Sequence, residues 1–153
     1  MNDDEICVHF EAGLRDFLAA DMRLVEFDAD ERAVGARLAR FVAPYFEGFD
    51  TDSDYNRRGP DLDPKYLNLP AECRGGGRRR VKPDLIVHHR GDDTTNILVG
   101  EIKMETNNEP RDCDLIRVSA FRAQLYYRVG FFLELPAGRG AADRAHAITW
   151  FRD

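Results

Sequence analysis

Three charged residues stand at the ends of two strongly hydrophobic segments in the middle of the chain. Asp84 precedes an apolar Leu-Ile-Val triplet, and Glu101 and Lys103 close the apolar run that begins at Ile97. Charged groups next to such segments are costly to bury unless they are paired, hydrogen-bonded or bound to a metal ion. Two carboxylates brought together repel each other, and a hard divalent cation removes that repulsion. These residues are therefore the first candidates for a reactive site.

The segments that carry these charges have the composition of central β-strands. Residues 81–88 and 96–104 are apolar on both faces, which is typical of strands that are covered on each side. Side chains alternate along a strand, so Glu101 and Lys103 share one face while Ile102 points to the other. A Gly-Asp-Asp turn separates the two segments, and pairing through it can bring the aspartate of the first strand close to Glu101.

The elements around this hairpin follow from apolar periodicity. The sequence predicts a helix at about 4–20, a helix that begins at Glu31 and ends near Pro44, a short strand within 49–56, the two central strands, a helix over 110–129, and strands at 131–135 and 146–151. At 153 residues the chain suits one domain, residues 1–153. The predicted fold class is α/β (α+β), with a central mixed sheet flanked by helices and an extra N-terminal helix.

Pro83-Asp84, followed by Glu101-Ile102-Lys103 on the next hydrophobic strand, resembles the signature of the PD-(D/E)XK, or restriction-endonuclease-like, nuclease superfamily. The resemblance covers roughly residues 31–135. It implies a core of helix, three strands, helix and strand (αβββαβ), which is the order predicted from periodicity. It also implies metal-dependent hydrolysis of phosphodiester bonds in DNA, with RNA left open.

The same resemblance implies a role for each central residue. Asp84, Glu101 and the backbone carbonyl of Ile102 would bind Mg²⁺, for which Mn²⁺ could substitute. The metal ion would polarise the phosphate and activate a water molecule. Lys103 would orient that water and offset developing charge. The structural alternative for Lys103 is an ion pair with Glu101.

A further acid on the first core helix is also implied by the resemblance. Glu31 is the candidate, as a catalytic residue and metal ligand, with Glu26 as the fallback. The local alternative is that Glu31 completes an N-terminal capping box with Asp28, and the two roles do not exclude each other.

Several polar residues are candidates for contact with nucleic acid. The run from Asp54 to Arg57 resembles a Glu-Tyr-Asn-Arg element of uncharacterised bacterial members of the superfamily, in which Arg57 could hold a phosphate and Tyr55 could stack on a base or pack. Residues 57–82 are locally basic, as expected for a partner that carries phosphates, although charge alone favours a solvated loop. Gln124, on the helix predicted over 110–129, is a further candidate, and the alternative is that it lies on a solvated helix face. The set is Tyr55, Asn56, Arg57, Arg78, Arg79, Arg80 and Gln124.

Composition narrows the other possibilities. The net charge of −6 argues against a nonspecific nucleic-acid coat, and no apolar run is long enough to span a membrane. The acidic N-terminus is unlike a secretory leader, and three cysteines without a CxxC pair predict neither a disulfide framework nor a zinc site. A cytoplasmic protein is therefore expected, acting as a homodimer or beside a partner protein. Two rival functions stay open: a non-catalytic nucleic-acid- or protein-binding domain of the same fold, and an α/β interaction protein with structural charges.

Overall fold

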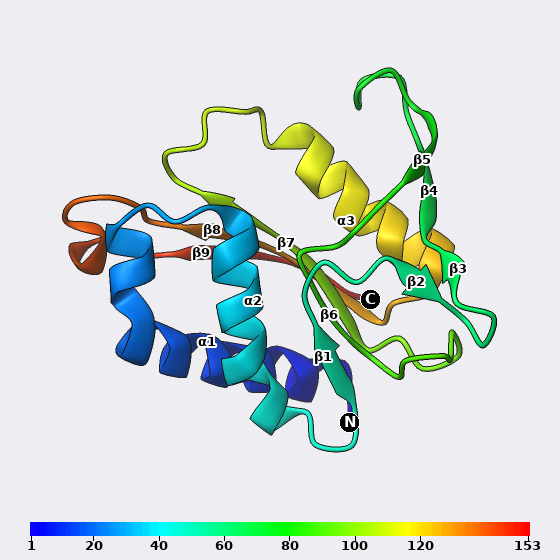
Figure 1. Ribbon diagram of the computed structural model, residues 1–153, viewed down its shortest axis with the longest axis horizontal. Helices are drawn as coiled ribbons and strands as arrows, with labels where there is room; N and C mark the ends of the chain where they lie inside the picture. The colour runs from blue at the N-terminus through cyan, green and yellow to red at the C-terminus, as the bar shows by residue number, and fades with distance from the viewer.

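The computed structural model describes residues 1–153, and a five-stranded mixed sheet lies at its centre with helices on both faces (Figure 1). The helices are α1 (Asp3–Glu26), α2 (Glu31–Val42) and α3 (Asp112–Leu125), with short 3₁₀ turns η1 (Ala43–Tyr45) and η2 (Ala141–Asp143). The sheet consists of β1 (Asp50–Asp52), β6 (Leu85–His88), β7 (Leu98–Met104), β8 (Val129–Leu135) and β9 (Ala147–Phe151). Two small ladders lie outside it: β2 (Arg57–Arg58) with β3 (Asp63–Pro64), and β4 (Tyr66–Leu69) with β5 (Gly77–Arg80).

The strand order in the central sheet is β1-β6-β7-β8-β9. Strand β6 is antiparallel to both β1 and β7, and β9 is antiparallel to β8. Strands β7 and β8 are parallel, and α3 forms the crossover that two consecutive parallel strands require. The predicted α+β architecture, with a mixed central sheet flanked by helices, is confirmed.

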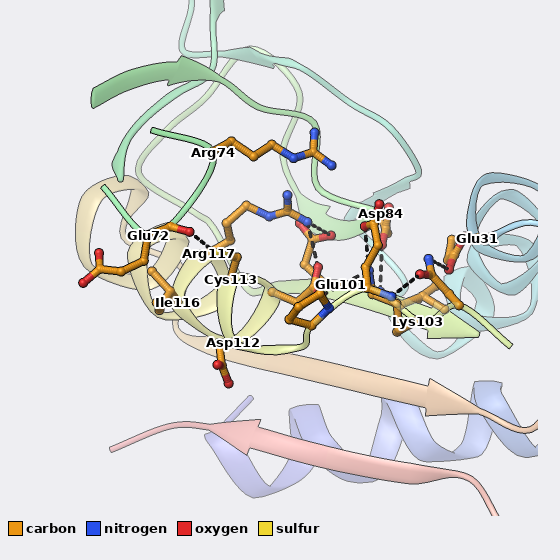
Figure 2. A pocket seen from close by; sticks show the side chains of 15 residues that line it. Glu31, Glu72, Arg74, Asp84, Glu101, Lys103, Asp112, Cys113, Ile116 and Arg117 are labelled. Atoms are coloured by element: carbon orange, nitrogen blue, oxygen red, sulfur yellow. Dashed lines mark hydrogen bonds and ion pairs between the residues drawn. The ribbon is translucent and has the colours of Figure 1, made fainter. Parts of the chain in front are cut away.

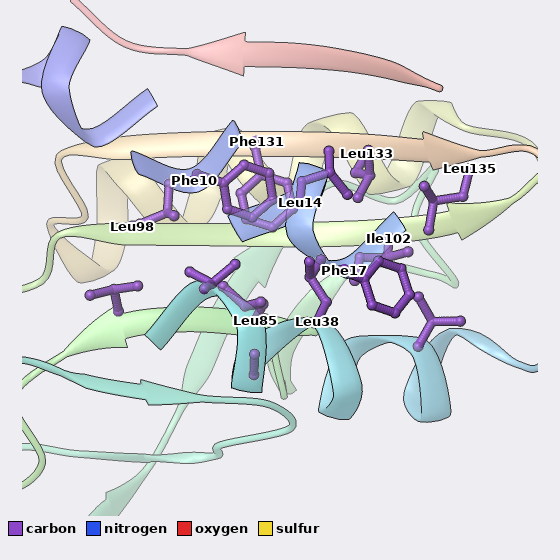
Figure 3. Packing of buried hydrophobic residues seen from close by; sticks show 14 of the residues in the cluster. Phe10, Leu14, Phe17, Leu38, Leu85, Leu98, Ile102, Phe131, Leu133 and Leu135 are labelled. Atoms are coloured by element: carbon purple, nitrogen blue, oxygen red, sulfur yellow. The ribbon is translucent and has the colours of Figure 1, made fainter. Parts of the chain in front are cut away.

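The two faces of the sheet are covered by different helices. Helices α1 and α2 cover one face, where the larger hydrophobic cluster includes Phe10, Leu38, Ile102 and Phe131 (Figure 3). Helix α3 and strand β4 cover the other face through a smaller cluster that contains Ile86, Val99, Phe121, Leu125 and Leu67. Alternation along β6 and β7 places positions 84, 101 and 103 on the same side as Ile86 and Val99, which is the α3 face.

Outside the sheet, the β4–β5 hairpin projects beyond α3 (Figure 1). Its strands are joined by residues 70–76, within the segment 57–82 for which the sequence also allows a solvated loop. All four residues of β5 are exposed, so no apolar alternation marks this strand in the sequence. Leu67 of β4 is fully buried, and the amide of Gln124 on α3 bonds to both backbone groups of Asn68. The hairpin is thus held by its contacts with α3.

Two predicted features of the helices change in the structure. The first helix does not end near residue 20 but continues to Glu26, with a kink at Asp21. The residue that caps α2 is Asp30, whose carboxylate accepts the Ala33 amide. The capping box between Asp28 and Glu31 is therefore wrong, because Asp28 has a left-handed backbone and its carboxylate accepts the Thr106 hydroxyl instead.

The cysteine prediction is also wrong. Cys73 and Cys113 form a disulfide, with Cα atoms 5.5 Å apart and 40 positions of sequence between them, while Cys7 is free and buried. The bond joins the β4–β5 hairpin to the first turn of α3. It removes the argument from cysteine content for a reducing compartment. Separately, none of the helices is both long enough and apolar enough to cross a membrane.

Gly100 is required by the close approach of β7 to an aromatic ring of β8. Gly100 and Phe131 are paired across the parallel ladder, and a Cβ at position 100 would lie inside the Phe131 ring. That ring is fully buried and packs against Phe10 with centroids 4.2 Å apart, so it cannot move freely. We expect Gly100→Ala to lower the free energy of unfolding by about 2 to 3 kcal/mol and the melting temperature by roughly 8 °C, measured by thermal melts.

The matched test of this steric cause is the double variant Gly100→Ala/Phe131→Leu. A smaller side chain at position 131 makes room for the new methyl group, so the double variant should lose less stability than the sum of the two single variants. Additive losses, or a Gly100→Ala variant as stable as the wild type, would show that the ring does not impose glycine here.

Candidate active site

The two central carboxylates meet because of the register between β6 and β7. Leu85 lies opposite Gly100 in this antiparallel ladder. One step further along the same register places Asp84 opposite Glu101, and opposite residues share a face of the sheet. Their carboxylates lie in hydrogen-bonding contact. The predicted approach of the aspartate to Glu101 is therefore observed.

These side chains open into a pocket of about 580 Å³ between the end of β7 and the first turn of α3 (Figure 2). Lys103 lines the same pocket and, like Glu101, is buried. Ile102 packs into the core on the opposite face, as alternation predicts. Seven carboxylates and three cationic side chains line the pocket: Glu31, Glu72, Asp84, Glu101, Glu109, Asp112 and Asp114, with Arg74, Lys103 and Arg117. Without a bound cation such a lining repels phosphate.

The adjacent carboxylates of Asp84 and Glu101 are difficult to ionise together. Burial raises the pKa of Asp84 to about 6, against a hydrogen bond of 2.7 Å that its Oδ2 accepts from the Ile102 amide. Burial and the neighbouring Asp84 carboxylate raise the pKa of Glu101 well above its ordinary value. The pair must share a proton or be neutralised by a cation.

A third acid, Asp114, contacts Lys103 and Arg117, the two cationic residues next to this carboxylate pair. Its Oδ2 lies 3.1 Å from the Lys103 ammonium, and its Oδ1 accepts a hydrogen bond of 2.9 Å from Arg117. Arg117 also reaches Glu101, at 3.1 Å. The predicted alternative ion pair between Lys103 and Glu101 is thus replaced by two others, because Arg117 of α3 lies closer to Glu101 and Lys103 turns toward Asp114.

Glu31 lies at the opposite end of the pocket from Arg117, on the first turn of α2. Its Oε1 accepts hydrogen bonds from the Met104 amide at 3.2 Å and from the Asn107 side chain at 2.9 Å. Burial alone would raise the pKa of Glu31, but these hydrogen bonds lower it below its ordinary value. Glu31 thus lines the pocket as an ionised carboxylate that braces the end of β7. Glu26, the fallback acid, is the last residue of α1 and lies outside the pocket.

The carboxylate and carbonyl oxygens of this site suit a hard divalent cation that takes only a few of its ligands from the protein. No group of three or more His, Cys, Asp or Glu side chains converges in the structure, and two carboxylates face each other here. The β6 ladder ends at Leu85, so no strand residue pairs with Ile102 on that side of β7. The Ile102 carbonyl points to that side, as does its amide, which Asp84 occupies. Mg²⁺ is commonly held by one or two carboxylates, with water and phosphate completing its shell.

The polar cluster at residues 54–57 lies beside the site, and some of its side chains are engaged in packing contacts. The Asp54 amide donates to the Pro83 carbonyl, at 3.1 Å, which ties this cluster to the residue before Asp84. Tyr55 packs edge-on against His88 and accepts the Lys65 ammonium over its ring at 4.5 Å, so of its two predicted roles the structure shows packing. Asn56 and Arg57 are exposed.

The remaining predicted contacts with nucleic acid divide in the same way. Arg78 and Arg80 flank the ring of Tyr66 on the outer face of the hairpin. Arg79 points to the other face and donates to the carbonyls of Gly76 and Arg74, closing the turn. The amide of Gln124 is occupied by the backbone of β4 and is not presented to a ligand.

Asp114, Arg117 and Arg74 are among the pocket residues that the sequence does not single out as members of the site. Asp114 is indistinguishable from an ordinary acid in the first turn of a helix. Arg117 belongs to a polar stripe with Gln124 and Arg128, whose members make separate contacts in the fold. The only signal in the sequence was the basic composition around Arg74.

Comparison of this chain with protein-family models, with curated proteins and with solved structures gives no match.

Proposed function

We propose that this protein is a metal-dependent nuclease that hydrolyses phosphodiester bonds, with DNA as the first substrate and RNA as the second. One observation carries the proposal: Asp84 and Glu101 meet across adjacent central strands, and Lys103 opens into the same pocket. Carboxylate pairs with a neighbouring lysine are suited to a hard cation and a phosphate.

The order of elements supports the proposal. Apart from the two small ladders inserted between β1 and β6, helix α2 is followed by β1, β6 and β7, then by α3 and β8. This is the order of helix, three strands, helix and strand that the superfamily resemblance implies. Asp84 lies just before β6, and Glu101 and Lys103 lie within β7.

In this proposal Asp84, Glu101 and the Ile102 carbonyl hold the cation. When bound, Mg²⁺ supplies charge that polarises the phosphate and lowers the pKa of a coordinated water molecule. The two carboxylates then lose the proton that they must otherwise share. Arg117 keeps Glu101 oriented through its 3.1 Å contact.

Lys103 acts on the attacking water and the phosphate. Its ammonium has three donors, and the contact with Asp114 uses one of them. Glu109 lies beyond hydrogen-bonding distance, at 3.8 Å, so the other two donors can orient water and offset negative charge that develops on the phosphate. Asp114 positions Lys103 and is itself neutralised by Arg117, so it does not add an unpaired charge.

The test is cleavage of closed circular plasmid and of labelled single-stranded DNA and RNA by the purified protein in Mg²⁺. We expect nicking or shortening that EDTA stops and that Mn²⁺ restores. An Asp84→Ala protein purified in the same way is the control for contaminating nucleases, and it should be inactive.

Calorimetry with Mg²⁺ separates the proposal from its rivals. A wild-type protein that binds neither Mg²⁺ nor Mn²⁺ would contradict the proposal and favour an interaction protein with structural charges. A protein that binds the metal and nucleic acid but leaves every substrate intact would be the non-catalytic alternative.

A further inference from the structure

Arg74 is the one cation of the pocket whose charge is not already paired. Lys103 contacts Asp114 and Glu109, and Arg117 contacts Asp114 and Glu101. The Arg74 guanidinium makes no ion pair or hydrogen bond, although it lines the pocket. Arg74 is exposed, and in Figure 2 its side chain lies above that of Arg117. A free guanidinium in this place is suited to bidentate binding of a phosphate that enters from solvent.

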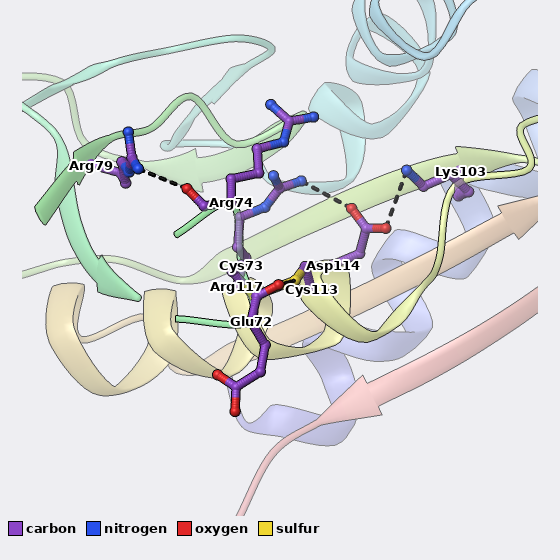
Figure 4. The surroundings of a disulfide bond; sticks show 8 residues. All are labelled: Glu72, Cys73, Arg74, Arg79, Lys103, Cys113, Asp114 and Arg117. Atoms are coloured by element: carbon purple, nitrogen blue, oxygen red, sulfur yellow. Dashed lines mark hydrogen bonds and ion pairs between the residues drawn. A yellow bond between two sulfur atoms is a disulfide. The ribbon is translucent and has the colours of Figure 1, made fainter. Parts of the chain in front are cut away.

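The position of Arg74 depends on the residue before it. Cys73 is buried and bonded to Cys113, the second residue of α3 (Figure 4). Cys113 directly precedes Asp114, the acid that orients Lys103 and Arg117. The disulfide therefore fixes the hairpin tip to the same helical turn that organises the other two cations.

Other tethers of the hairpin act farther from Arg74. Gln124 and Leu67 hold β4 near its middle. Beyond Cys73, Arg74 and the three glycines that follow have positive φ angles between 52° and 82°. Glycine-rich backbone of this kind has high conformational freedom once a tether is lost. Without the disulfide, the tip that carries Arg74 keeps one side-chain hydrogen bond to α3, the weak 3.3 Å contact of the Cys113 sulfur with the Glu72 carbonyl.

We propose that Arg74 binds a phosphate of the nucleic-acid substrate, and that the Cys73–Cys113 disulfide is a redox-controlled clasp that holds Arg74 over the pocket. This inference rests on the proposed function for the nature of the substrate. It adds a binding residue and a control by redox state that the metal site alone does not require.

The redox step is ordinary thiol–disulfide exchange with a dithiol reductant. A thiolate of the reductant attacks one sulfur and forms a mixed disulfide, which the second thiol of the reductant then resolves. Two electrons and two protons pass to Cys73 and Cys113, which become thiols, and the reductant becomes a disulfide. Cys113 is partly exposed and gives the reductant access to the bond.

The first measurement is the state of the bond. Alkylation of the native, air-oxidised protein should modify neither Cys73 nor Cys113, and alkylation after dithiol treatment should modify both, as read by mass spectrometry. Buried Cys7 serves as the internal reference. Free thiols at both positions in the oxidised protein would overturn the clasp.

The second measurement is binding of a fluorescent oligonucleotide, with Ca²⁺ in place of Mg²⁺ to suppress cleavage. We expect Arg74→Ala to raise Kd about tenfold with little change in melting temperature, and reduction of the wild type to raise Kd by a similar factor. Cys73→Ser/Cys113→Ser should match the reduced wild type and ignore the dithiol. Arg40→Ala, an exposed arginine of α2 outside the pocket, is the matched control and should bind as the wild type does.

The decisive comparison is reduction of the Arg74→Ala variant. If the disulfide acts through Arg74, reduction has no further effect on binding by this variant, whereas a general structural role would weaken binding again. A second tenfold loss in the Arg74→Ala background would overturn the inference, as would a wild type that does not respond to reduction.

The same samples assayed for cleavage in Mg²⁺ separate this inference from the proposed function. Binding that depends on Arg74 and on redox state, without cleavage by the wild type, would refute the nuclease and keep the clasp. Cleavage that neither Arg74→Ala nor reduction alters would keep the nuclease and refute the clasp. A wild type that neither binds nor cuts would refute both.

Discussion

Replacing Lys103 with methionine is expected to slow phosphodiester cleavage by about two to three orders of magnitude while Mg²⁺ binding is retained. Methionine preserves the length and the apolar stem of the side chain but removes the ammonium, which lines the same pocket as the carboxylate pair. Asp84 and Glu101 keep their contacts, so the metal ligands are unchanged. The loss should appear in kcat, measured with a labelled oligonucleotide at saturating Mg²⁺.

The fold should tolerate this change. Asp114 loses Lys103 but keeps Arg117 at 2.9 Å, so no buried carboxylate is left without a partner. Thermal melts should show nearly wild-type stability and an undiminished rise with Mg²⁺. Arg40→Ala provides a matched loss of one positive charge away from the pocket and should cleave normally. A Lys103→Met protein that cleaves at the wild-type rate would remove Lys103 from the mechanism.

The central hairpin is the part of this fold that local sequence determines most fully. Two apolar segments around a Gly-Asp-Asp turn are sufficient to predict adjacent antiparallel strands. Alternation then places Glu101 and Lys103 on one face, and the structure confirms both. The apolar pattern does not determine the register between the two strands, and a shift of one residue would turn the aspartate away from Glu101.

The remainder of the pocket comes from contacts that are distant in sequence. Cys73 and Cys113 are 40 positions apart, and nothing in the local pattern indicates that the hairpin tip reaches α3. Strand β5 is wholly exposed and is stabilised through its partner β4, so its residues carry no apolar alternation to detect. Asp114 and Arg117 have the ordinary appearance of a polar helix start. Such residues become recognisable only when the fold places them beside Glu101.

Glu31 illustrates how a correct position can have a different local cause. Sequence suggested both a helix cap and a site residue for this glutamate. The capping residue is Asp30, one position earlier, since the backbone turns at Asp28. Freed from the cap, Glu31 reaches across to the end of β7 and lines the pocket.

Replacing Asp84 with asparagine is expected to abolish cleavage and, in the absence of metal, to stabilise the protein. Asparagine can still accept the Ile102 amide through Oδ1, and its NH₂ group can donate to Glu101 where the wild type has two carboxylates in contact. The variant therefore removes the electrostatic conflict while it preserves the shape of the site. A cost of this kind is common where a binding function requires buried charge.

The direction in which Asp84→Asn changes the folding stability depends on the pH through the pKa of Asp84. The pKa of Asp84 rises from its ordinary value of 3.8 in the unfolded chain to about 6 in the folded protein. The protonated carboxyl therefore contributes stability that is fully present below pH 3.8 and is lost as the pH rises through about 6. Asparagine does not titrate, so the stability advantage of Asp84→Asn should be small at pH 4 and should reach about 1 to 2 kcal/mol at pH 8, allowing for partial solvent screening.

Mg²⁺ should reverse this order of stability. At about one hundred times its Kd, a ligand that binds only the folded state adds roughly 2.7 kcal/mol. Wild-type protein should gain this increment at pH 8 and exceed the Asp84→Asn variant, which lacks one of the two carboxylate ligands and should hardly respond. Asp61→Asn, an exposed acid outside the pocket, is the matched control and should follow the wild type in both conditions. Only a carboxylate pair that repels when empty and is relieved by a cation produces this reversal. The pair would therefore not be a cation site if Asp84→Asn were less stable than the wild type in EDTA at pH 8, or if Mg²⁺ raised the stability of both proteins equally.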